Sequence, residues 1–94
     1  MNLIFDTHAH YDSEGFDSDR EQVLKGLPEH GVCHVVNVGA TLAGCRASLE
    51  LAEQYPWIFA GVGVHPEECG DLPEDWLEQV REMSRAPKVV AIGE

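Results

Sequence analysis

Basic residues are scarce in this sequence: Lys and Arg together number 6 against 17 Asp and Glu, which gives a formal net charge of −11. Proteins that bind nucleic acid over a broad surface rely on clustered Lys and Arg. The composition therefore argues against a wide electrostatic interface with nucleic acid. It still permits a phosphate substrate, because bound divalent cations invert the local field of a carboxylate-rich site.

The sequence also lacks an apolar run long enough to span a bilayer. Its first residues, MNLIFDTHAH, have neither the basic region nor the cleavage site of a secretory signal. We therefore expect a cytoplasmic protein without a membrane partner. Cysteine is limited to Cys33, Cys45 and Cys69, in no metal or redox spacing, so we expect reduced and mostly buried thiols.

What is present is a regular alternation of apolar segments within a length of 94 residues, which suits one domain, 1–94. Strands are predicted at 3–5, 33–39, 57–64 and 88–94. Amphipathic helices are predicted between them: one after a capping box at 18–21, one from Thr41 to Pro56, and one over 72–85 with Pro73 near its first turn.

This order predicts an α/β fold with a parallel sheet of four βα-type units. Right-handed crossovers place all helices on one face of such a sheet and leave the other face bare. A closed TIM (β/α)₈ barrel of about 250 residues would bury that face. We therefore expect the first half of such a barrel, whose open face is covered by a missing C-terminal half or by self-association.

The residues after the first strand carry the clearest chemistry. His8 and His10 lie two positions apart, so both imidazoles project from one side if the strand persists, and Asp6 shares that parity. Two imidazoles beside a carboxylate suit zinc or manganese, at the strand ends where parallel α/β proteins hold their sites. The alternative is that both histidines bond loop carbonyls or water.

Two further residues end later strands. His65, flanked by Gly63 and Pro66, suits contact with an anionic substrate, or equally a bond to backbone. Glu94 ends the fourth strand on the same side, although a terminal residue is usually solvated. The acidic run Glu67–Glu68 is interpreted as solvated loop charge.

Three blocks in register, IFDTHAHYD, GVGVHP and VVAIGE, resemble the TatD family of metal-dependent deoxyribonucleases, which are amidohydrolase-like barrels. The resemblance covers the whole chain and marks it as the N-terminal portion. It implies that His8 and His10 bind one metal and that Glu94 is a ligand bridging two divalent ions, of zinc, manganese, magnesium or nickel. It also implies that His65 contacts substrate.

The resemblance implies hydrolysis of phosphodiester bonds in DNA by a metal-activated water. Family members often carry a histidine where this chain has Glu67, and their remaining ligands and base lie on later strands. No catalytic residue is therefore assigned, and we expect weak metal binding and little turnover from the chain alone. The alternatives are a phosphoesterase of the PHP type, whose first strand also carries His-x-His, and a non-catalytic, self-associating half barrel.

Overall fold

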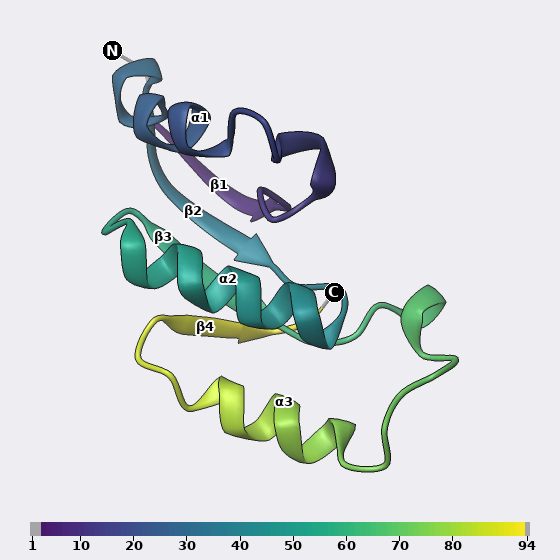
Figure 1. Ribbon diagram of the computed structural model, residues 1–94. Helices are drawn as coiled ribbons and strands as arrows, with labels where there is room; N and C mark the ends of the chain where they lie inside the picture. The colour runs from purple at the N-terminus through teal and green to yellow at the C-terminus, as the bar shows by residue number, and fades with distance from the viewer. Residues whose placement is uncertain (1–2, 94) are drawn as a thin grey trace.

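The computed structural model describes residues 3–93, in which four parallel strands alternate with helices (Figure 1). The strands lie side by side in sequence order, β1-β2-β3-β4, and every neighbouring pair is parallel. The α/β fold expected from the sequence is thus confirmed. In chain order the elements are β1 (Ile4–Ala9), η1 (Glu14–Phe16), α1 (Arg20–Gly26), η2 (Pro28–His30), β2 (Val32–Val38), α2 (Leu42–Gln54), β3 (Ile58–Val62), η3 (Pro66–Glu68), α3 (Trp76–Ser84) and β4 (Val89–Ile92).

The helices pack against one face of the sheet. Side chains alternate between the faces of a strand, so Ile58, Ala60 and Val62 of β3 point the same way. Ile58 and Ala60 share one buried cluster with Leu24 of α1 and with the C-terminal half of α2. Val62 shares a second cluster with Cys45 of α2 and Val80 of α3. All three helices therefore cover the same face, as right-handed crossovers require.

The opposite face and the sheet edges are poorly covered. Ile4 and Phe5 of β1 are 52% and 56% exposed, and Val90 and Ile92 of β4 are 56% and 66% exposed. The first strand was predicted at 3–5 as a short apolar run, and its predicted end is wrong. It continues to Ala9, and Ala9 alone among its residues is buried, because β1 has a neighbour on one side only.

The predicted capping box is also wrong. Helix α1 begins at Arg20, and the side chain of its N-cap residue Asp19 makes no capping hydrogen bond. Glu21 instead forms an ion pair with Lys25 one turn later, at 2.7 Å. By contrast, Thr41 caps α2 as expected, since its Oγ1 accepts a hydrogen bond from Gly44 N at 2.9 Å.

The third helix is shorter than its sequence pattern predicts. Helix α3 begins at Trp76, and Pro73 lies in the preceding turn, where its carbonyl accepts a hydrogen bond from Trp76 N at 3.1 Å. Strand β4 ends at Ile92, and Glu94 lies outside the described residues. Within 3–93, no helix has both the length and the apolar character needed to cross a membrane.

The thiols are more varied than expected. All three cysteines are free, but only Cys45 is buried, while Cys33 is half-buried and Cys69 is exposed. The expectation of mostly buried thiols is therefore wrong for Cys69, which lies in the irregular segment after η3 rather than in a strand or helix.

Candidate functional site

The carboxyl ends of the first three strands meet at one cleft. Its volume is about 440 Å³, and residues following β1, β2 and β3 contribute His10, Ala40 and His65 to its walls. A hydrogen bond from His65 N to Ala40 O, at 2.8 Å, ties the segments after β2 and β3 together. Parallel α/β folds place ligand sites at this end of the sheet. A larger hollow of about 690 Å³ lies between α1 and α2, and none of the histidines lines it.

His8, in β1, and His10, just after it, lie together. Their ring centroids are 4.9 Å apart and the rings meet edge to face. This agrees with the expectation that both imidazoles project from one side. The strand is irregular here, because the register advances three residues in β1, from Asp6 to Ala9, against two in β2. The extra residue is a β-bulge, a feature that redirects side chains near sites.

The bulge breaks the simple alternation that linked Asp6 to both histidines. One carboxylate oxygen of Asp6 instead accepts a hydrogen bond from the backbone N of His8 at 3.1 Å. Asp6 therefore bonds the backbone of the strand at His8. The shared parity assumed from the sequence does not hold across an inserted residue.

A backbone carbonyl defines the tautomer of His10. Its Nδ1 lies 2.8 Å from the carbonyl oxygen of Val38, at the end of β2. A carbonyl oxygen only accepts, so Nδ1 carries the proton and donates. In the neutral form of the ring the lone pair is then on Nε2, and this is the usual arrangement of a metal-binding histidine whose other nitrogen bonds backbone.

His65 has the opposite arrangement. It caps the short helix η3, and its Nδ1 accepts a hydrogen bond from Glu67 N at 3.0 Å. The neutral ring then carries its proton on Nε2, so this nitrogen is a donor. A donor suits contact with an anionic oxygen better than coordination of a cation. The alternative that His65 bonds backbone thus also holds, since one nitrogen does so.

The cleft is acidic. Asp12, Glu67 and Glu68 line it, and among the described lining residues there is no Lys or Arg. Glu67 and Glu68 were interpreted as solvated loop charge, and although both are exposed, they face this cleft rather than a featureless surface. An anionic ligand in this cleft would need a cation to offset the three carboxylates.

The end of β4 comes close to the end of β3. Gly93 N donates to Val62 O at 3.0 Å. A Cβ added to Gly63 would collide with the backbone carbonyl of Gly93, so this approach depends on glycine at position 63. The fourth strand therefore ends at the same edge of the sheet as the cleft, whereas the predicted ligand Glu94 lies outside the described residues.

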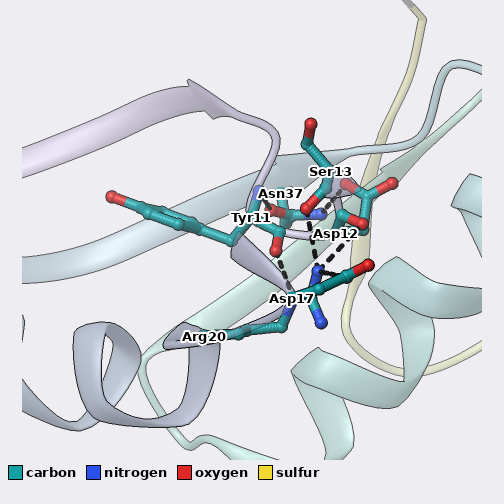
Figure 2. Close-up of polar contacts among 6 residues, drawn as sticks. All are labelled: Tyr11, Asp12, Ser13, Asp17, Arg20 and Asn37. Carbon is teal, nitrogen blue, oxygen red and sulfur yellow. Dashed lines mark hydrogen bonds and ion pairs between the residues drawn. The ribbon is translucent and has the colours of Figure 1, made fainter. Parts of the chain in front are cut away.

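Sequence reasoning missed a polar network beneath the cleft (Figure 2). Asn37 of β2 is completely buried, and its side chain bonds both Tyr11 and Asp12 in the segment after β1. Arg20 of α1 holds the same segment from the other side. One signal was available: Asn37 interrupts the apolar run of the second strand, and a buried amide must find partners.

Comparison with known proteins agrees with this geometry. The family model described as TatD related DNase matches residues 5–94. The chain belongs to this family. A phosphoesterase of the PHP type is accordingly not supported.

Several TatD relatives are similar over nearly the whole chain. It is 38% identical to the uncharacterized metal-dependent hydrolase YabD of Bacillus subtilis (strain 168), with 98% of the chain and 36% of the relative covered. It is 35% identical to the 3'-5' ssDNA/RNA exonuclease TatD of Pectobacterium parmentieri (strain WPP163), covering 97% of the chain and 35% of that protein. It is also 35% identical to the uncharacterized metal-dependent hydrolase YjjV of Escherichia coli (strain K12), with 97% of the chain and 36% of that protein covered. The chain thus spans about a third of the length of these TatD relatives.

The residues present fit the divalent metal that a TatD protein implies, but only in part. His8 and His10 supply two adjacent imidazoles, which suit a borderline cation such as zinc. No group of three or more His, Cys, Asp or Glu residues that could hold an ion occurs within 3–93. A complete first coordination sphere would therefore need donors beyond this part of the chain.

Proposed function

We propose that the chain is the N-terminal portion, 1–94, of a metal-dependent TatD hydrolase that cleaves phosphodiester bonds in DNA. The observation that carries the proposal is the pair of adjacent imidazoles beside an acidic cleft at the strand ends, in a chain of this family. A curated relative named as a 3'-5' ssDNA/RNA exonuclease supports the choice of substrate class.

The proposal assigns His8 and His10 as ligands of one divalent ion, with Glu94 as a further ligand that bridges to a second. Zinc, manganese, magnesium and nickel are the candidate ions. When bound, such an ion supplies Lewis acidity, which lowers the pKa of a coordinated water and offsets charge on a phosphate. The bond from His10 Nδ1 to Val38 O supports this assignment, since it leaves the lone pair on Nε2.

The chain's own residues would also orient the substrate. His65 has its Nε2–H available as a donor because Nδ1 already accepts from Glu67 N. We assign this donor to a phosphate oxygen of the substrate. The three carboxylates of the cleft would repel that same phosphate unless cations were bound. The acidic cleft is thus consistent with a substrate that enters together with metal.

The metal content of the purified chain tests the assignment. We expect zinc, manganese or nickel at less than one ion per chain in the wild type, and loss of that metal in His8→Ala and His10→Ala. His30→Ala is the matched control, because His30 ends the short helix η2 and does not line the cleft. Elemental analysis measures the result. Equal metal content in all four proteins would exclude His8 and His10 as the ligands.

A nuclease assay tests the substrate class. The chain alone and a version extended by the C-terminal part of a TatD relative would be incubated with single-stranded DNA and added manganese. We expect hydrolysis by the extended protein, lost in its His10→Ala variant, and little hydrolysis by the chain alone. An extended, folded protein that binds metal but cleaves no DNA would contradict the substrate class and leave the metal assignment standing.

A further inference from the structure

We propose that Arg20 and Asn37 act as positioning residues that clamp the segment after β1, so that the His10 ring is held against the Val38 carbonyl in its metal-competent tautomer. The metal part of this inference rests on the proposed function. The clamp itself rests on hydrogen bonds between described residues, most of them drawn in Figure 2.

Asn37 holds the segment from the sheet side. Its Oδ1 accepts from Tyr11 N at 2.6 Å, and its Nδ2 donates to Asp12 Oδ1 at 3.0 Å and to Ser48 Oγ at 2.8 Å. Ser48 Oγ in turn donates to Gly44 O of the same helix α2. Every hydrogen-bonding group of this fully buried amide except one acceptor lone pair is therefore used.

The chemistry of these partners also determines the orientation of the amide. A backbone N–H can only donate, so it must face Oδ1, and an ionised carboxylate can only accept, so it must face Nδ2. If the Asn37 amide were rotated by half a turn, its NH₂ group would face the N–H of Tyr11, and its oxygen would face the carboxylate of Asp12. Neither pair can form a hydrogen bond. The side chain of Asn37 can therefore form these hydrogen bonds in only one orientation of its amide.

Arg20 holds the same segment from the helix side. Its Nε donates to Tyr11 O at 2.6 Å, and its Nη2 donates to Ser13 O at 2.8 Å and more weakly to Asp12 O at 3.2 Å. The same Nη2 lies 2.8 Å from Asp17 Oδ1. A planar guanidinium with its donors in a rigid fork can hold several backbone carbonyls at once, and a lysine cannot reproduce that geometry.

Asn37 and Arg20 both bond the backbone of Tyr11, the residue after His10. Asn37 holds the N–H of Tyr11, which belongs to the peptide bond shared with His10, and Arg20 holds the carbonyl of Tyr11. Val38, whose carbonyl receives His10 Nδ1, follows Asn37 directly in β2. Two consecutive residues of β2 therefore hold His10: Asn37 bonds the peptide that follows it, and Val38 bonds its side chain. Loosening either grip would let the ring leave its carbonyl partner.

Arg20→Met tests the clamp, with Arg81→Met as the matched control. Both substitutions remove one positive charge from a helix, but the guanidinium of Arg81 bonds the nearby Glu78 of its own helix and not the segment after β1. The first readout is the ¹⁵N chemical shifts of the imidazole nitrogens in the metal-free chain at about pH 8, where an ordinary imidazole is neutral. We expect His10 to be mainly the Nδ1–H tautomer in the wild type and in Arg81→Met, and a mixture of tautomers in Arg20→Met.

The second readout is the affinity for zinc, measured by competition with a chelating dye. Loss of a residue that orients a metal-binding histidine typically weakens binding by about tenfold or more, and we expect at least that for Arg20→Met. A residue with only a stabilising role would lower the melting temperature without changing either readout. A folded Arg20→Met protein with the wild-type tautomer and affinity would overturn the proposal.

Arg20→Lys keeps the test decisive if Arg20→Met does not fold. The lysine retains the charge and the aliphatic stem but not the fork, so we expect a partial shift in tautomer and an affinity between those of the wild type and Arg20→Met. A lysine variant that matches the wild type in both readouts would contradict the role of the fork. If the wild-type chain binds no zinc at all, the proposed function fails while the tautomer measurement still decides the clamp.

Discussion

At the scale of single residues, the two cleft histidines differ in which nitrogen carries the proton. His10 donates from Nδ1 to a carbonyl, whereas His65 accepts at Nδ1 from a backbone N–H. The difference follows from the backbone groups that each ring meets and not from the residue type. Two histidines with the same side chain are thereby suited to different tasks, one as a ligand through Nε2 and one as a donor through Nε2–H.

Cys45 provides a prediction about thiol reactivity. It is fully buried, and its Sγ donates to Gly63 O at 3.2 Å. Burial raises the pKa of this thiol above its ordinary value of 9.0. The thiolate is the reactive form, so we expect an aromatic disulfide reagent at about pH 8 to modify exposed Cys69 first and Cys45 only after unfolding. Equal rates for all three thiols in the native chain would contradict this.

The same shift predicts a dependence of stability on pH. The native thiol has the higher pKa, so Cys45 contributes its full stability below about pH 9 and loses that contribution as the pH rises through the native pKa. Alkaline unfolding curves of the wild type and of Cys45→Ala measure the effect. We expect the stability of the wild type to fall more steeply with pH, and parallel curves would show that the thiol makes no such contribution.

At the scale of elements, two similar capping signals in the sequence, at Ser18 and at Thr41, have different outcomes in the structure. Thr41 caps α2 through a bond to Gly44 N, whereas Ser18 caps nothing because α1 begins two residues later, at Arg20. Arg20, the first residue of α1, instead donates to the carbonyl of Tyr11 in the segment after β1. The start of α1 is thus marked by a tertiary contact and not by the local capping signal.

Thr41→Ala and Ser18→Ala form a matched pair that tests this difference. Removing a used N-cap costs about 1 kcal/mol of stability, and removing an exposed hydroxyl without a structural role costs less than about 0.5 kcal/mol. We therefore expect a lower urea midpoint for Thr41→Ala and an almost unchanged midpoint for Ser18→Ala. A larger loss for Ser18→Ala than for Thr41→Ala would restore the predicted capping box.

At the scale of the whole molecule, the main feature of the surface is a set of exposed apolar side chains on the edge strands β1 and β4. Ile4, Phe5, Val90 and Ile92 are each more than half exposed, although all belong to strands. Aromatic contacts continue across the sheet from Phe5 to His34 and on to Phe59. Large exposed apolar patches normally mark a surface that another polypeptide covers.

We expect the purified chain to form a dimer or a larger assembly through this surface, and Phe5→Lys to shift it toward the monomer. Leu77→Lys is the matched control, because Leu77 is similarly exposed, at 52%, but belongs to helix α3 and not to a strand of the sheet. Light scattering at several concentrations measures the mass. A folded wild-type monomer at all concentrations would show that the open sheet does not self-associate.

The sequence by itself determined the parallel α/β order, the capped helix α2 and the adjacency of His8 and His10. These features follow from local rules: hydrophobic period, capping chemistry, and alternation along a strand. Family motifs added the metal hypothesis, which remains a prediction because its third ligand, Glu94, lies outside the described residues.

Only the tertiary structure decided which polar groups meet. The bulge in β1, the inward amide of Asn37, the grip of Arg20 on three carbonyls and the protonated nitrogen of each histidine all depend on partners distant in sequence. Hydrogen bonds are short-ranged and directional, so they are specified by how segments pack and not by the pattern within one segment. Local periodicity could predict the order of strands and helices, but not the exact end of each strand or which atoms face each other there.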